Sequence, residues 1–251
     1  MRILVLIFLL LLFNLPNAVA LSFNSFITTR YGAGYPMVDS ADNLYLYVHD
    51  GSSDTANRHV AVFDPNLTEL RTFNTVADAH YGPITIYNDE LYSAESIWSG
   101  DLGSLARYNL NGDLLETYPN AIQGGYDLLV SSNGTIRANH DYVYINNYFD
   151  TGNYVLSGFG EASSLALGEN DTFYISDPFL GVISKYDSYG GMHWSRTFSF
   201  YFWDIEVVGD KLLATSINDR VEILSLIDGS HLGGVDLGLQ AVVLAASENY
   251  L

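Results

Sequence analysis

A strand–turn–strand pattern that returns about every 40 residues is the feature that most limits how this chain can fold. In each copy an apolar run reaches a polar turn, and a second apolar run follows at once. The copies lie near residues 37–45, 84–92, 132–135, 169–173, 209–212 and 247–250. After residue 20 the runs are short and rich in Val, Ile, Tyr, Phe and Thr, while helical periodicity is nearly absent. The pattern predicts an all-β chain.

A second strand–turn–strand element follows each of the first five copies. Examples are residues 62–73, 107–118 and 185–198, whose turns contain Asn, Asn-Gly and Gly-Gly. Gly and Asn adopt positive φ angles at little cost, as tight hairpins require. Two such elements give four strands per unit. A four-stranded meander repeated at this period predicts a β-propeller built of four-stranded antiparallel blades.

The number of blades follows from the positions at which each blade begins. We expect these blade boundaries near residues 35, 82, 125, 162, 203 and 240. We predict six blades, the last of them incomplete. Residues 239–246 and 250–251 would supply its inner strands and residues 23–29 its outer strand, whereas its third strand is missing. This count suggests a sequence truncated at its C-terminus. A five-bladed ring with an extra C-terminal strand is the alternative.

The first 20 residues have the features of a secretory signal peptide. Met1-Arg2 precede an apolar stretch from Ile3 to Phe13, and Ala18-Val19-Ala20 form a small-x-small cleavage site. The apolar stretch is too short to span a bilayer comfortably, and no later segment is better suited. We therefore predict a signal peptide at 1–20, a propeller domain at 21–251 and no membrane span after cleavage. An uncleaved N-terminal anchor is the alternative.

The predicted signal peptide and the composition limit the compartments and the partners that we expect for this protein. The predicted signal peptide indicates a secreted protein, either extracellular or periplasmic, with the cell surface as a further alternative. The chain has no cysteine, so an apolar core and not disulfides must stabilise it. Its formal net charge of -19 argues against nucleic acid and anionic membranes as partners and favours cations or basic partners. We expect a monomer.

The end of the second strand of each unit carries an acidic residue. These residues are Asp50, Glu95, Asp141, Asp177 and Asp219. Together with Asn43-Leu44-Tyr45 and Val62-Phe63-Asp64, this pattern resembles the NHL repeat over nearly the whole mature chain. The resemblance implies a propeller whose recurring carboxylate accepts backbone N–H groups in the turn that follows, a structural role.

The chain is also distantly similar to two groups of propeller enzymes. The gluconolactonase and regucalcin group implies a metal in the central channel and a Glu-Gly-Pro segment near the start. Here Tyr81-Gly82-Pro83 follows His80, so the glutamate is absent. Streptogramin-lyase-like propellers pair a histidine base with a metal, and His80 and His140 would suit that arrangement.

Candidate functional residues lie where loops surround the mouth of the channel. The loops that precede the first strand of each blade and those that follow the second emerge on the same face, here called the top face. The candidate ligand-binding residues there are Tyr35, His80, Tyr81, Tyr126, Asp127, His140, Glu161, Trp203 and Asp204. If Asp127, Glu161 and Asp204 converge, they could bind a divalent cation such as Ca²⁺, since hard cations prefer several oxygen ligands.

The sequence leaves two functions open. The first is a non-enzymatic module that binds a protein or glycan through the top face. The alternative is a metal-dependent lyase or lactonase-type hydrolase at the channel mouth, with His80 or His140 as general base. The sequence contains no EF-hand spacing, HExxH, GxSxG or P-loop motif, so it does not decide whether the protein is an enzyme. A display module within a longer protein is a third interpretation.

Overall fold

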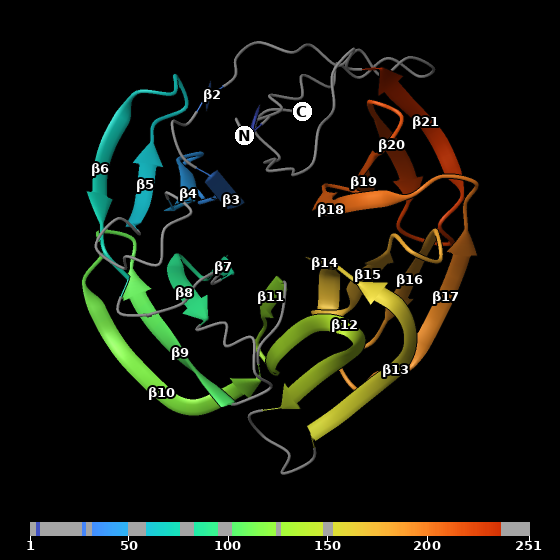
Figure 1. Ribbon diagram of the computed structural model, residues 1–251, viewed down its shortest axis with the longest axis horizontal. Coiled ribbons are helices and arrows are strands. Elements are labelled where there is room, and N and C mark those ends of the chain that lie inside the picture. Colours follow the sequence, from blue (N-terminus) through green and yellow to red (C-terminus); the bar gives the residue numbers. More distant parts are fainter. Residues whose placement is uncertain are drawn as a thin grey trace.

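The strands of this chain form a ring of sheets around a common centre. The computed structural model describes residues 4–5, 27–28, 32–49, 59–75, 83–94, 102–123, 127–147 and 153–236. Within them five antiparallel sheets radiate outward, with β3, β7, β11, β14 and β18 innermost (Figure 1). The predicted all-β propeller is confirmed. No helix in these residues is long and apolar enough to cross a membrane.

Four of the five blades have four strands each, in chain order from the inside outward. The first blade contains β3 (Gly32–Val38), β4 (Leu44–His49), β5 (His59–Phe63) and β6 (Glu69–Phe73). The second contains β7 (Ile84–Tyr87), β8 (Glu90–Ala94), β9 (Leu102–Asn109) and β10 (Leu114–Gln123). The fourth contains β14 (Ser164–Leu167), β15 (Phe173–Asp177), β16 (Val182–Tyr186) and β17 (Met192–Thr197), with the short 3-10 helix η2 (Glu169–Asp171) after β14. The fifth contains β18 (Phe202–Val208), β19 (Lys211–Ser216), β20 (Arg220–Ser225) and β21 (His231–Asp236).

The third blade has three strands, β11 (Asp127–Val130), β12 (Gly134–Asn147) and β13 (Asn153–Ala162). The first half of β12 pairs with β11 and its second half with β13. We expected a strand to end at Asp141, and this expectation is wrong. The physical reason is local: Tyr-Val-Tyr-Ile follows Asp141, so β-favouring residues continue without a turn residue. At the equivalent place in the fourth blade, Pro178 follows Asp177 and the strand ends.

The prediction of six blades is wrong, and the five-bladed alternative agrees with the structure. Ile27–Thr28, expected in the outer strand of a sixth blade, form β2 and pair with β1 (Leu4–Val5). An outer strand needs a third strand as its neighbour, and the described residues contain none beside β2. The predicted inner strands at 239–246 and 250–251 lie outside the described residues. The other boundaries are confirmed, because the five inner strands begin at residues 32, 84, 127, 164 and 202.

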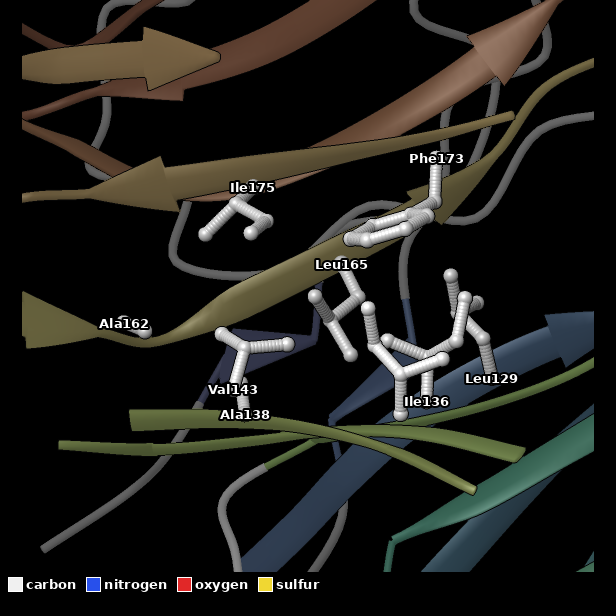
Figure 2. Close-up of a cluster of buried hydrophobic side chains, with 9 residues drawn as sticks. Leu129, Ile136, Ala138, Val143, Ala162, Leu165, Phe173 and Ile175 are labelled. Carbon is white, nitrogen blue, oxygen red and sulfur yellow. The ribbon is translucent and has the colours of Figure 1, made fainter. Parts of the chain in front are cut away.

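The core consists of apolar layers between neighbouring blades. The third and fourth blades are covered on both faces, and β11 and β15 are accordingly buried along their whole length. Figure 2 shows the layer between the third and fourth blades, where Leu129, Val143, Leu165 and Phe173 meet. Each such side chain contributes roughly 1.5–3 kcal/mol when fully buried. This packing fixes the blades around the channel.

One turn motif closes hairpins in three of the blades. Oδ1 of Asp39 accepts the backbone N–H groups two and four residues ahead, at 2.9 and 2.8 Å. Asp64, Asn109 and Asp187 repeat this arrangement between the third and fourth strands of their blades, at 2.8–3.0 Å. Such side chains replace the backbone partners that a turn leaves unpaired. Some of the acidic residues that give the chain its negative charge therefore stabilise turns.

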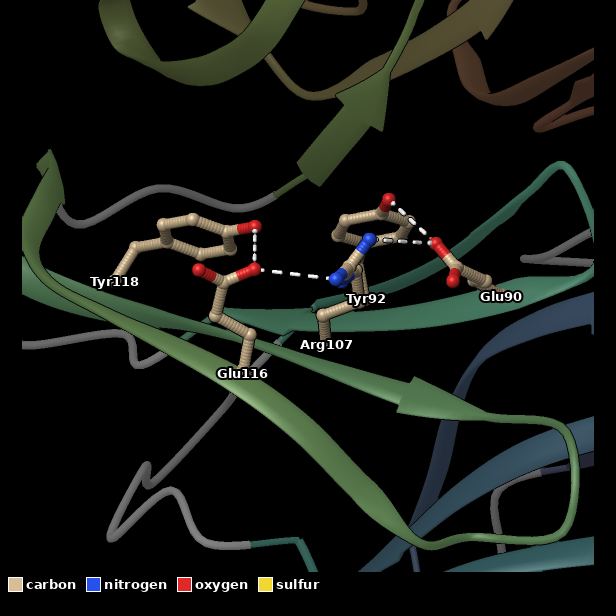
Figure 3. Close-up of polar contacts among 5 residues, drawn as sticks. All are labelled: Glu90, Tyr92, Arg107, Glu116 and Tyr118. Atoms are coloured by element: carbon tan, nitrogen blue, oxygen red, sulfur yellow. Dashed lines mark hydrogen bonds and ion pairs between the residues drawn. The ribbon is translucent and has the colours of Figure 1, made fainter.

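Polar side chains also connect strands of the second blade. Figure 3 shows Arg107 on β9 between Glu90 on β8 and Glu116 on β10, at N–O distances of 3.3 and 3.1 Å. The hydroxyls of Tyr92 and Tyr118 donate to the same two carboxylates. These five side chains thus form one connected polar network within one sheet. We assign this network to blade stability and not to a binding site.

Candidate functional site

Two of the three predicted metal-binding carboxylates come together at the channel mouth. Asp127 begins β11, and its Oδ2 accepts the backbone N–H of Leu165 on β14 at 2.7 Å. Asp204 lies near the start of β18, and its Oδ1 accepts the hydroxyl of Ser164, also on β14, at 2.6 Å. The start of β14 therefore holds both carboxyl groups, one from each side.

A third acidic residue of the channel, Glu206, was not among the predicted site residues. It lies two positions after Asp204 on β18, and alternate residues of a strand share a face. This Asp-x-Glu spacing was the signal that could have identified it. We overlooked Glu206 because the predicted site residues all lie at strand ends, whereas this residue lies within an inner strand.

The three carboxyl groups influence one another electrostatically. Burial, reinforced by the charge of Asp204, raises the pKa of Asp127 to about 7, although backbone N–H bonds from Leu165 and Leu128 oppose the shift. Burial also raises the pKa of Glu206 well above its usual range, and both Asp204 and Asp127 add to the effect. Like charges in a low-dielectric site disfavour ionisation. This cluster therefore retains protons close to neutral pH.

The channel widens into a cavity of about 120 Å³ beside Glu206. All five inner strands contribute to its wall. The side chains of the wall are apolar except for those of Glu206 and Thr85, but polar atoms make up more than half of the surface that the wall exposes. A small ligand there would meet apolar side chains, other polar atoms and one carboxyl group.

The predicted calcium site receives partial geometric support. Ca²⁺ takes six to eight oxygen ligands, but both oxygens of Asp127 already accept backbone N–H groups. Glu161 is half-buried at the end of β13, and its carboxyl does not join the other two. No group of three His, Asp or Glu side chains suited to a metal occurs in the described part of the chain. The metal site stays a prediction.

The remaining predicted residues are only partly described. Tyr35 and His140 have backbones in β3 and β12, while their side chains lie outside the described part. His80, Tyr81 and Tyr126 lie outside the described residues altogether. Their roles at the channel mouth remain predictions.

Apolar side chains gather on the top face of the fourth and fifth blades. We call this set the top-face patch: Phe179 (71% exposed), Leu180 (48%), Tyr201 (47%), Trp203 (40%) and Ile217 (37%). Only Trp203 was predicted from the sequence. The other four were missed because an isolated apolar loop residue carries no pattern, and only the fold brings these loops to one face.

Backbone contacts join the three loops that carry the top-face patch. The N–H of Ile217 donates to the carbonyl of Tyr201 at 3.2 Å, and the N–H of Phe198 donates to the carbonyl of Gly181 at 2.8 Å. The β15–β16 and β19–β20 loops therefore both meet the segment before β18. Beneath this segment Phe198, Phe200 and Phe202 pack with ring centroids 4.9–5.8 Å apart. The loops thus pack on a cluster of three aromatic rings.

A β-bulge directs Trp203. Phe202 pairs with Ser216 and Asp204 with Thr215, so Trp203 has no counterpart on β19. Bulges of this kind change the direction of a side chain relative to the regular pleat. The bulge explains how Trp203 remains exposed between the buried Phe202 and the carboxyl group of Asp204.

Asp177 holds the loop that presents Phe179 and Leu180. Its buried carboxylate accepts the N–H of Leu180 at 2.9 Å, within the turn that follows. It also accepts N–H groups of Gly160 at 2.7 Å and Glu161 at 3.2 Å, both on β13. The predicted structural role of the strand-end carboxylate is therefore confirmed at Asp177, which in addition ties the fourth blade to the third.

Comparison with known proteins gives a fold but no family. No family model matches the sequence, and no curated protein matches it. Solved structures do match, among them virginiamycin B lyase from Staphylococcus aureus, with a TM-score of 0.56, 13% identity, and coverage of 82% of this chain and 70% of that one. A chain of the mitotic checkpoint complex matches with a TM-score of 0.62, 11% identity and coverage of 92% and 73%. The chain is a β-propeller, and the NHL resemblance stays a prediction.

Proposed function

We propose that this chain is a secreted binding module whose top-face patch binds a protein partner. The propeller fold commonly serves as a scaffold for protein interaction, and the top-face patch is the observation that carries the proposal. Trp and Tyr are over-represented among residues that dominate binding energy at interfaces. Five apolar side chains on adjoining loops, all at least 37% exposed, form the kind of surface that partners cover.

The chemistry of the partner follows from the charges beside the top-face patch. Asp219 shares the β19–β20 turn with Ile217, and Glu161 lies next to the β15–β16 loop through Asp177. With a formal net charge of -19, the chain also attracts cationic partners at long range. We therefore expect a peptide segment that combines apolar or aromatic anchors with Lys or Arg.

Selection from a displayed peptide library, followed by binding measurements on variants of the top face and of the opposite face, tests the proposal. A random peptide library is selected on the wild-type protein, and the recovered peptides are measured against Trp203→Ser and Phe179→Ser. Ile227→Ser is the matched control, because Ile227 is 88% exposed in the β20–β21 turn, on the opposite face. We expect the first two variants to weaken binding about tenfold or more, or about 1.4 kcal/mol and above. Equal binding by all three variants would refute the top-face patch as the site.

A glycan array, run with the same proteins, distinguishes the two partner classes. Aromatic rings can also stack on the apolar face of a sugar, so a glycan ligand would depend on Trp203 and Tyr201 as well. Suppose that the library yields no binding peptides, while the wild-type protein binds a glycan that Trp203→Ser does not bind. The partner would then be a glycan and not a protein.

The metal-dependent lyase or lactonase-type hydrolase remains a second candidate, favoured by one observation. Asp127 and Asp204 do meet at the channel mouth, both held by β14. Metal content of the purified protein, and hydrolysis of a lactone panel with and without EDTA, test this candidate. A bound divalent ion together with EDTA-sensitive turnover would favour the enzyme over the binding module.

A further inference from the structure

The cavity in the central channel combines apolar side chains with one carboxyl group. Met37, Leu129 and Leu165 are among the apolar residues that surround it, and none of its lining residues is basic. Within the described residues, no hydrogen-bond donor of the protein reaches the Glu206 carboxyl. Charged groups are rarely enclosed without a partner, because the loss of hydration is costly. Glu206 therefore keeps a proton or pairs with a cation that the described residues do not supply.

The size of the cavity limits what can enter. Water occupies about 30 Å³ in the liquid, and an apolar cavity of about 150 Å³ binds benzene. A volume of about 120 Å³ thus suits a compact body of roughly four to six non-hydrogen atoms.

We propose that this cavity binds a small organic ammonium compound, with the Glu206 carboxylate as counter-ion and the apolar wall around its hydrocarbon part. Charge complementarity selects the cationic group, and cavity size selects a short or branched alkyl chain. The site is separate from the top-face patch and does not depend on the proposed protein partner.

Isobutylamine, with isobutanol as its neutral isostere, tests the proposal by calorimetry and thermal shift. We expect the ammonium form to bind the wild-type protein at least about tenfold more tightly than the alcohol. Glu206→Gln should remove this difference and leave alcohol binding unchanged.

A matched variant separates the cavity from general attraction to an acidic protein. Glu69 is exposed on β6, so Glu69→Gln removes the same charge far from the channel and should leave amine binding unchanged. Three results would each overturn the proposal: equal affinity for amine and alcohol, equal loss in both variants, or no saturable binding of either probe. Glu206→Gln should remain folded, because the substitution breaks no hydrogen bond among the described residues.

Discussion

At the scale of single residues, Gly181 is the position at which the top-face patch depends most on backbone freedom. Its φ angle is +64°, in the left-handed region, and a Cβ placed there would lie 2.9 Å from the carbonyl oxygen of Phe198. Glycine is therefore required at this position for two reasons: the left-handed conformation and the close approach of the neighbouring segment. The hydrogen bond between Gly181 and Phe198 depends on that approach.

Replacing this glycine tests that requirement. We expect Gly181→Ala to lower the free energy of unfolding by about 2–3 kcal/mol, because left-handed strain and the contact with the Phe198 carbonyl add. Gly158→Ala is the control, since Gly158 has a φ of +95° but no atom within 4 Å of the position that a Cβ would occupy. Urea unfolding of both variants measures the difference. Equal destabilisation would show that the contact contributes nothing.

At the scale of secondary-structure elements, Asp177 at the end of β15 helps to position the β15–β16 loop. Asp177→Ala would leave partly buried N–H groups of Gly160, Glu161 and Leu180 without their acceptor. We expect a loss of about 3 kcal/mol in stability, and weaker binding of peptides selected on the top-face patch. Asp187→Ala provides the comparison, because Asp187 caps a more accessible turn with two N–H bonds and should cost about 1 kcal/mol. Chemical denaturation of the two variants gives both values, and an equal cost would contradict the positioning role.

Elements also show where prediction from sequence succeeded and where it failed. Turn residues such as Asn88-Asp89 and Gly209-Asp210 mark hairpins because their backbone preferences act locally, and these hairpins are present. The length of β12 was misjudged because an acidic residue alone does not end a strand. The top-face patch and Glu206 were missed for another reason. Their grouping depends on loops and strands that only tertiary packing brings together.

At the scale of the whole molecule, the ring places acidic residues of separate inner strands in one channel. Asp127 belongs to the third blade, while Asp204 and Glu206 belong to the fifth, and β14 of the fourth blade lies between them. In the unfolded chain Asp127 is far from Asp204 and Glu206, and all three carboxyl groups are solvated. Folding therefore brings like charges together, and the stability of the propeller becomes dependent on pH.

The sign of this dependence follows from the pKa shifts. The pKa of Asp127 rises from 3.8 to about 7 on folding, so the folded state binds more protons than the unfolded state between these values. The stabilising contribution of the protonated form is complete below about pH 4 and is lost as the pH rises towards 7. Glu206 acts in the same direction, because burial and its two acidic neighbours raise its pKa as well.

Glu206→Gln isolates this effect, because the amide stays neutral at every pH. We expect the variant to have a higher Tm than the wild type at about pH 7.5, and a difference close to zero at about pH 4. Glu69→Gln, which removes an exposed carboxylate from β6, should show little difference at either pH. Calorimetric unfolding of the three proteins across this range provides the comparison. If the advantage of Glu206→Gln were the same at both pH values, ionisation in the channel would not be its cause, since a packing change acts regardless of protonation.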